Sequence, residues 1–151
     1  MKQPIKSQSI VPRIDGIQRD VKKRRELSRL SLTDFGEEDN FIRAQFYLGR
    51  AMEGVFHIGA HLFARLPGGR ATEYKTIALK LGEVGIVPQH FAEKNLKAMA
   101  GYRNRLTHFY ADITRTEIYR IVHENLDDFS TFLKAVKELL SNPDKLNLTV
   151  E

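Results

Sequence analysis

The feature that most constrains this chain is a long run of apolar residues at helical spacing between about Asp39 and Leu66. At about 100° per residue these side chains fall on one arc of a helix. Acidic residues at 37–39 suit a helix N-terminus, and Pro67–Gly69 ends the pattern. We therefore expect a long amphipathic helix that buries one stripe. The stripe consists of Phe41, Ala44, Leu48, Met52, Val55, Phe56, Gly59, Leu62, Phe63 and Leu66.

Helical patterns also dominate the rest of the chain. They predict helices over about 15–30, 74–81, 88–108 and 114–142, the last opening on Thr114-Arg-Thr-Glu117, which has the capping-box spacing. We find no repeat, no low-complexity segment and no alternating strand of useful length. Amphipathic helices bury their stripes against one another, so the expected fold is all-α, an antiparallel bundle of four to five helices.

The net charge of +5 is concentrated at the N-terminus. Residues 1–35 carry nine Lys or Arg against four Asp or Glu, and the remaining residues carry fifteen of each. We therefore divide the chain into a basic N-terminal helix or arm (1–35), a helical core (36–142) and a C-terminal tail (143–151). The run Lys22-Lys23-Arg24-Arg25 either contacts RNA phosphates or forms a solvated helix face.

Composition excludes several classes of protein. The chain has no cysteine, which excludes disulfides, thiolate metal sites and cysteine nucleophiles. His57, His61 and Arg65 interrupt the most apolar stretch, so no membrane span is expected. The N-terminus lacks the apolar region of a secretory signal. We expect a soluble cytoplasmic protein.

The densest polar cluster is Tyr102–Tyr110, near the end of a predicted core helix. Asn104 and His108 lie one helical turn apart, whereas Arg103 and His108 are five residues apart and start from different sides. One interpretation is a helix C-terminus with His108 well placed against the dipole. The other is chemical, because an imidazole can take a proton from a hydroxyl while a guanidinium binds phosphate. These groups would suit metal-free cleavage of RNA.

The same residues resemble a known family. Arg103–Tyr110 matches the Arg-X4-His-X-Tyr signature of HepT-like proteins, a branch of the HEPN superfamily (higher eukaryotes and prokaryotes nucleotide-binding), and Asn104 is the usual residue after the arginine. The resemblance covers about 37–140. It also includes the predicted long helix, with Arg50-Ala-Met-Glu53 and His61, and the turn Leu81–Ile86.

The resemblance implies a ribonuclease toxin of a toxin–antitoxin pair. Family members are homodimers whose motif helices meet at the two-fold axis, forming a composite RNA-cleaving cleft without metal or other cofactor. Arg103 would bind phosphate, His108 would act as general base or acid, and Asn104 would orient them. The usual partner is a minimal nucleotidyltransferase antitoxin, which in some pairs adenylylates the motif tyrosine, here Tyr110. An added AMP would block an entrance meant for RNA phosphates.

Other side chains allow more than one interpretation. Glu53, His57 and His61 share a stripe that is either a solvated face or, less in keeping with the family, a metal site. Glu53 could also pair with Arg103 or Arg50 at the cleft. Four tyrosines suit packing better than nucleotide stacking: Tyr47, Tyr74, Tyr102 and Tyr119.

Two further functions stay open alongside the toxin. The chain could be a non-catalytic helical module that docks a nucleotidyltransferase, with Arg103 and Asn104 serving the interface. It could also be a nucleotide-binding regulatory bundle. Only the toxin hypothesis requires His108 for RNA cleavage.

Overall fold

The computed structural model describes residues 2–71, 73–108, 110–124 and 127–151, and it confirms the expected all-α class. The helices are α1 (Ser7–Ser28), α2 (Leu32–Phe35), α3 (Glu38–Phe63), α4 (Tyr74–Glu83), α5 (Gln89–Phe91), α6 (Lys97–His108), α7 (Arg115–Glu124) and α8 (Asp128–Ser141). A π-helical segment spans Ala92–Leu96, and 3-10 turns span Tyr110–Asp112 and Pro143–Leu146. The strands are β1 (Gln3–Ile5) and β2 (Leu148–Val150).

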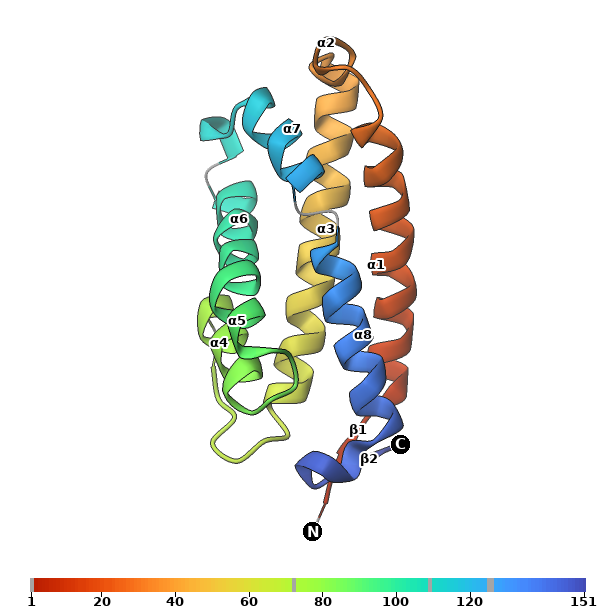
Figure 1. The fold of residues 1–151 in the computed structure, drawn as a ribbon, viewed down its shortest axis with the longest axis vertical. Helices are drawn as coiled ribbons and strands as arrows, with labels where there is room; N and C mark the ends of the chain where they lie inside the picture. Colours follow the sequence, from red (N-terminus) through yellow and green to blue (C-terminus); the bar gives the residue numbers. More distant parts are fainter. Residues whose placement is uncertain (1, 72, 109, 125–126) are drawn as a thin grey trace.

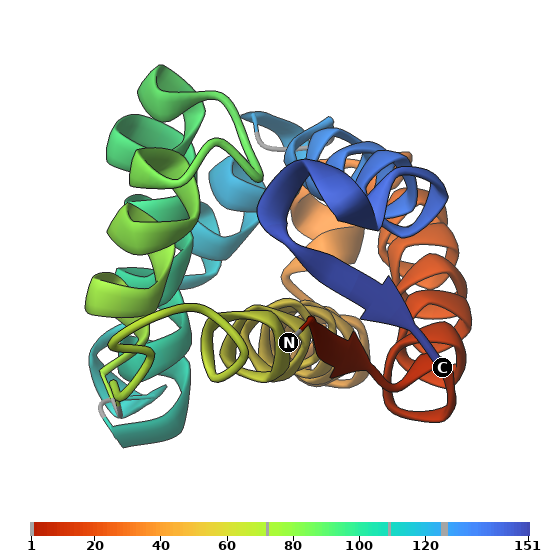
Figure 2. The same cartoon turned by 90° about the horizontal axis from the view of Figure 1, so that it is seen from below.

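Helix α3 is the element against which the other long helices are arranged. Figure 1 shows α1 beside α3 on one flank, α6 on the other, and α8 in front. Viewed from below, α4, α5 and α6 form one side of the molecule and α1 and α8 the other (Figure 2). The predicted stripe of α3 faces this interior: Ala44, Leu48, Met52, Val55, Phe56, Gly59, Leu62 and Phe63 are buried. The long-helix prediction is confirmed, although α3 ends at Phe63 rather than at Leu66.

Helix α1 is longer than predicted. It begins at Ser7 rather than near residue 15, and Pro12 lies inside it. The helix continues because Ile10, Ile14 and Ile17 extend one buried stripe, whereas Pro12 stays exposed. The basic segment therefore shares the core of the bundle. The domain boundaries at residues 35 and 142 stay predictions.

The chain ends carry the strands that the sequence did not indicate. β1 and β2 pair in parallel, with Ile5 opposite Val150 and Gln3 opposite Leu148. Both Ile5 and Leu148 are buried. Each strand has three residues, which is too short to show an alternating pattern. Residues 143–151, expected as a tail, thus fold back to the N-terminal segment, and both termini lie at one end of the bundle (Figure 1).

The prediction of one helix over 114–142 is wrong. The segment forms two helices, α7, which ends at Glu124, and α8, which begins at Asp128, and Asp127 lies in a turn before α8. The sequence pattern did not indicate this break, because the apolar residues of α7 and α8 recur with the same helical period. Thr114 does cap α7, accepting a hydrogen bond from the Glu117 N–H at 3.1 Å, but the Glu117 carboxylate pairs with Arg105 of α6.

Within the described residues, none of the helices combines the length and the apolar character needed to cross a membrane.

Candidate active site

Glu53 gathers side chains from three helices into one polar cluster. The Glu53 carboxylate on α3 accepts hydrogen bonds from Arg103 Nε of α6 at 2.6 Å and from Arg103 Nη2 at 3.3 Å. The hydroxyl of Tyr74, the first residue of α4, donates to the same carboxylate at 2.6 Å. The predicted pair of Glu53 with Arg103 is confirmed. A bidentate carboxylate fixes the plane of the guanidinium as well as its position.

An aromatic stack supports the guanidinium from one side. Arg103 Cζ lies 4.4 Å from the centre of the Tyr74 ring, within the range of a cation–π contact. The Tyr74 ring in turn stacks on Phe56 of the core at 4.8 Å. Tyr74 therefore packs, as predicted, and it also helps to position Arg103. Sequence reasoning missed this second role, because Tyr74 lies far from both partners along the chain.

The contacts keep Glu53 and Arg103 ionised and Tyr74 neutral. Burial alone would raise the pKa of Glu53, but hydrogen bonds from Arg103 and Tyr74 and the charges of Arg103 and His57 lower it overall. Burial, and then the bond to Glu53, raises the pKa of Tyr74 to about 12. The hydrogen bond to Glu53 is the main reason why the pKa of Arg103 is raised. At neutral pH the site thus combines a carboxylate, a neutral phenol and a guanidinium.

The rest of the motif follows Arg103 along α6. Asn104 Oδ1 accepts a hydrogen bond from Arg103 Nη1 at 3.1 Å. His108 is exposed and is the last residue of α6. Five helical residues place its Cα about 140° around the axis from that of Arg103. The side chain of Tyr110 lies outside the part of the chain that the structure describes.

The hydrogen bonds leave Arg103 able to bind a ligand. A guanidinium carries five N–H groups, and the bonds to Glu53 and Asn104 use three of them. Within the part of the chain that the structure describes, one N–H group of Nη1 and one of Nη2 remain, and this terminal pair can bind a phosphate in bidentate fashion. The Arg103 side chain is 20% exposed, so this pair lies near the surface.

The other members of the histidine stripe have separate partners. His57 Nε2 lies 3.1 Å from Glu53, whereas His61 Nε2 accepts a hydrogen bond from the Lys6 N–H at 3.2 Å. Across the described residues, no group of three or more His, Asp or Glu side chains could hold a metal ion. Arg50 does not bind Glu53 but pairs with the buried Asp20 of α1, with Nε 2.7 Å from the carboxylate.

The basic run of α1 divides into different environments. Lys22 and Arg25 line a groove, and Lys23 Nζ lies 3.9 Å from a Glu26 oxygen. Arg24 is fully buried and lies 5.1 Å from the Phe129 ring centre, so the expectation that it contacts RNA is wrong. Burial, and then the charge of Arg25, lowers the pKa of Arg24 to about 10. The rotation of α1 points Arg24 into the core, and the basic composition of the run gave no indication of this.

Comparison with known proteins identifies the family of this chain. The model of a family described as ribonuclease HepT-like matches residues 17–136. The chain belongs to the HepT-like ribonuclease family. The family region therefore begins within α1, earlier than the resemblance from residue 37 indicated, and it includes the Glu53 cluster and the motif helix.

Solved structures share the HepT-like fold of this chain. One is a toxin–antitoxin complex with AMP-PNP, with a TM-score of 0.78, 21% identity, and coverage of 87% of this chain and 98% of that one. Another is the tri-AMPylated HEPN toxin of Shewanella oneidensis in complex with an MNT antitoxin. For that chain the TM-score is 0.76 and the identity 22%, covering 85% of this chain and 96% of the other. No curated protein sequence matches.

Proposed function

We propose that this HepT-like protein is a cytoplasmic, metal-independent ribonuclease toxin of a toxin–antitoxin pair. One observation carries the proposal. Within the matched family region, Glu53 holds the Arg103 guanidinium in a fixed plane with its terminal N–H pair near the surface, five residues before the exposed His108. An oriented phosphate binder and an imidazole are the minimum set of groups for metal-free phosphodiester cleavage.

The proposed reaction gives each side chain of the motif a role. His108 accepts the proton of the RNA 2′-hydroxyl, whose oxygen attacks the adjacent phosphorus and displaces the 5′-oxygen of the next nucleotide. Arg103 neutralises the charge that develops on the phosphorane oxygens. Asn104 keeps the guanidinium aligned through its 3.1 Å hydrogen bond. A protonated imidazole then supplies the proton that the leaving oxygen needs.

The angle of about 140° between Arg103 and His108 supports a site composed of two copies of the chain. One α6 turns these residues toward different sides, so a homodimer with facing motif helices would bring the arginine of one protomer toward the histidine of the other. Exposed apolar side chains support such an interface. Ile42 and Phe46 of α3 are 53% and 54% exposed, and Gly49, three residues beyond Phe46, packs near Leu106 of the motif helix.

We propose a minimal nucleotidyltransferase antitoxin as the partner. The Shewanella oneidensis toxin, whose fold this chain shares, is AMPylated and bound to an MNT antitoxin. In this chain Tyr110 follows the motif histidine by two residues and offers a phenol to the same chemistry. Transfer of AMP to Tyr110, two residues after His108, would add negative charge to the motif, and this charge would repel RNA phosphates.

Replacement of His108 tests the ribonuclease. His108→Ala should lower RNA cleavage by about 10²–10⁴-fold, the range that general acid–base assistance contributes, and should abolish growth arrest on expression. EDTA should leave wild-type cleavage unchanged. His90→Ala is the matched control, because His90 is an exposed histidine of α5 outside the motif. Undiminished cleavage by the purified His108 variant would refute the proposed site.

Mass spectrometry of the protein co-expressed with a nucleotidyltransferase encoded by the adjacent reading frame tests the proposed AMP transfer to Tyr110. We expect additions of AMP mass that map to Tyr110, loss of these additions in Tyr110→Phe, and loss of cleavage in the modified protein. AMP found only on other residues would contradict the assignment of Tyr110.

A non-catalytic docking module is the second candidate function. The hydrogen bonds of Arg103 with Glu53 and Asn104 favour it, because they would also fix the conformation of an arginine that serves a protein interface. In this case the purified protein would cleave no RNA, and it would bind the nucleotidyltransferase whether or not His108 is replaced.

A further inference from the structure

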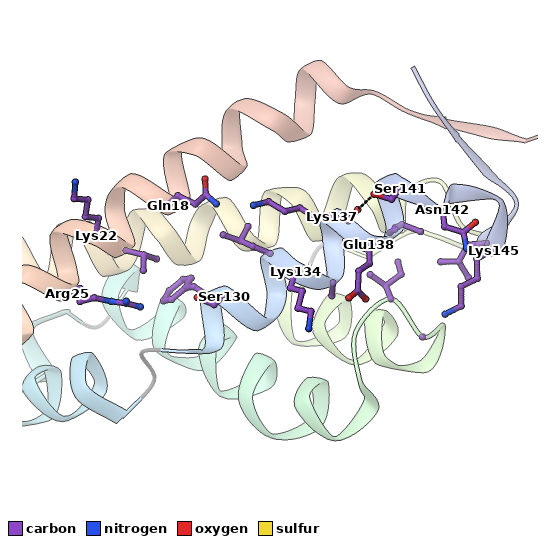
Figure 3. A pocket seen from close by; sticks show the side chains of 18 residues that line it. Gln18, Lys22, Arg25, Ser130, Lys134, Lys137, Glu138, Ser141, Asn142 and Lys145 are labelled. Atoms are coloured by element: carbon purple, nitrogen blue, oxygen red, sulfur yellow. Dashed lines mark hydrogen bonds between the residues drawn. The ribbon is translucent and has the colours of Figure 1, made fainter.

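A large groove lies away from the motif cluster. A groove of about 1000 Å³ runs between α1, α8 and the turn after α4, and Figure 3 shows the side chains that line it. Helix α8 lines the groove, whereas α3, which carries Glu53, lies on the opposite side of the bundle from α8 (Figures 1 and 2). The volume is at the upper end of the range for ligand sites.

The rim of this groove is strongly cationic. Five basic side chains line it, and all of them are exposed: Lys22, Arg25, Lys134, Lys137 and Lys145. Glu138 is the one acidic residue among the lining side chains that the structure describes. The α1 residues of the rim are two members of the basic run, so the N-terminal charge excess is continued by lysines from the other end of the chain. Only the fold brings these two groups together.

The floor of the groove is apolar. Val21, Ile86, Leu133 and Leu146 lie among the lining residues, and together they offer a surface on which flat rings can pack. An apolar floor with a cationic rim matches a ligand that has rings on one side and anionic groups on the other. A single-stranded nucleic acid has this pattern, with bases on one edge and phosphates on the other.

The cations follow a line rather than converging on one point. Arg25 lies toward one end of the groove, Lys134 in the middle and Lys145 at the other end (Figure 3). Lys134 and Ser141, which also line it, are about 10 Å apart along α8 at 1.5 Å per residue. A single phosphate would need several cations around it, whereas a row of cations suits the repeating phosphates of a strand.

We propose that the groove between α1 and α8 binds a single-stranded stretch of RNA remote from the cleavage site. The inference rests on the proposed function, since it makes the groove an anchor for the same RNA substrate. Charge complementarity favours this occupant. An acidic surface of the antitoxin would satisfy the rim as well, but it would not use the apolar floor in the way that bases do.

The test is a binding measurement with an oligonucleotide that cannot be cleaved. A fluorescent 12-nucleotide 2′-O-methyl RNA lacks the attacking hydroxyl, so anisotropy reports binding alone. The groove variant combines Lys134→Gln, Lys137→Gln and Lys145→Gln in the full chain. Each lost phosphate contact lowers the salt slope by about 0.7, so the slope should fall by about 2. At about 0.1 M salt the Kd should rise about 100-fold, and the difference should vanish near 1 M.

Two control variants test whether the effect depends on the charges of this groove. The matched variant replaces three exposed lysines outside the groove, Lys80, Lys94 and Lys97, by glutamine, and its Kd should change far less. Glu138→Gln removes the acid of the rim and should lower the Kd several-fold. All substituted side chains are exposed, so the fold should persist, and circular dichroism checks this.

The outcomes separate this inference from the proposed function. Weakened binding by the groove variant, with binding retained in the control, supports the groove even if the wild-type protein cleaves no RNA. Unchanged oligonucleotide binding by the groove variant overturns it, even if His108-dependent cleavage is found. Loss of antitoxin binding without loss of RNA binding also overturns it and would identify the groove as a protein-docking surface.

Discussion

At the scale of single residues, His61 makes the stability of the fold depend on pH, because its unprotonated ring binds the N-terminal segment. Its Nε2 accepts the Lys6 N–H and therefore must be unprotonated in the folded protein. Burial, and then the charges of Arg65, Arg13 and Lys6, lowers the pKa of His61 to about 4. An unfolded histidine has a pKa of about 6.5, so the unfolded chain binds this proton more readily. The stabilisation is complete above pH 6.5 and is lost as the pH falls toward 4.

We therefore predict that the free energy of unfolding decreases between pH 7 and pH 4.5, and that His61→Gln reduces this decrease. Urea titrations followed by circular dichroism at both values measure it. His90→Gln is the control, because exposed His90 should leave the full pH dependence in place. An identical pH dependence in the His61 variant and the wild-type protein would show that another group is responsible.

At the scale of secondary-structure elements, the pair β1 and β2 closes the chain on itself. The Glu151 N–H donates to the Ile5 carbonyl at 2.8 Å, and the Ser7 N–H donates to the Glu151 carbonyl at 2.9 Å. Leu148, 1% exposed, anchors β2 in the core. These contacts join residues 5–7 to Glu151, so a substitution in β2 should also affect β1.

Leu148→Ala should lower the free energy of unfolding by about 2–5 kcal/mol, the usual cost of truncating a buried leucine. Chemical denaturation measures this value, and hydrogen exchange should show faster exchange of the β1 amides. Val150→Ala lies in the same strand but removes a side chain that is 42% exposed, so its effect should stay within about 0.5 kcal/mol. Equal losses in both variants would mean that β2 is not anchored by Leu148.

At the scale of the whole molecule, the exposed apolar side chains of α3 allow a test of the proposed homodimer. In the proposed homodimer, Ile42 and Phe46 are buried against the second copy beside the motif helices. Carboxylates at these two positions would be buried at the interface, and their desolvation would oppose dimerisation. The double variant Ile42→Glu and Phe46→Glu should therefore be monomeric by light scattering, and it should lose cleavage as fully as His108→Ala does.

Val11→Glu is the matched control, because Val11 is 46% exposed on α1, away from the motif. It should leave both the oligomeric state and the cleavage unchanged. A monomeric double variant that still cleaves RNA at the wild-type rate would show that one chain suffices for the site.

Local pattern was enough for most of the helical layout. The apolar stripe of α3 and the Thr114 cap depend on residues within a few turns of each other, and periodicity and capping record such relations. The same information failed at the break before Asp128, where the apolar period continues although the helix does not. It also failed at β1 and β2, whose pairing joins residues at opposite ends of the chain.

Residue patterns were sufficient to predict the helical class, the stripe that α3 buries and the spacing of Arg103, Asn104 and His108. Each of these is a property of one segment. Packing between distant segments sets the rest: Glu53 binds Arg103 while Arg50 binds Asp20, and Arg24 is buried. Such packing also brings lysines of α8 to the same groove as Lys22 and Arg25 of α1. The physical reason is that the spacing of residues sets the faces of a helix, whereas its rotation against distant neighbours is set by packing of the whole core.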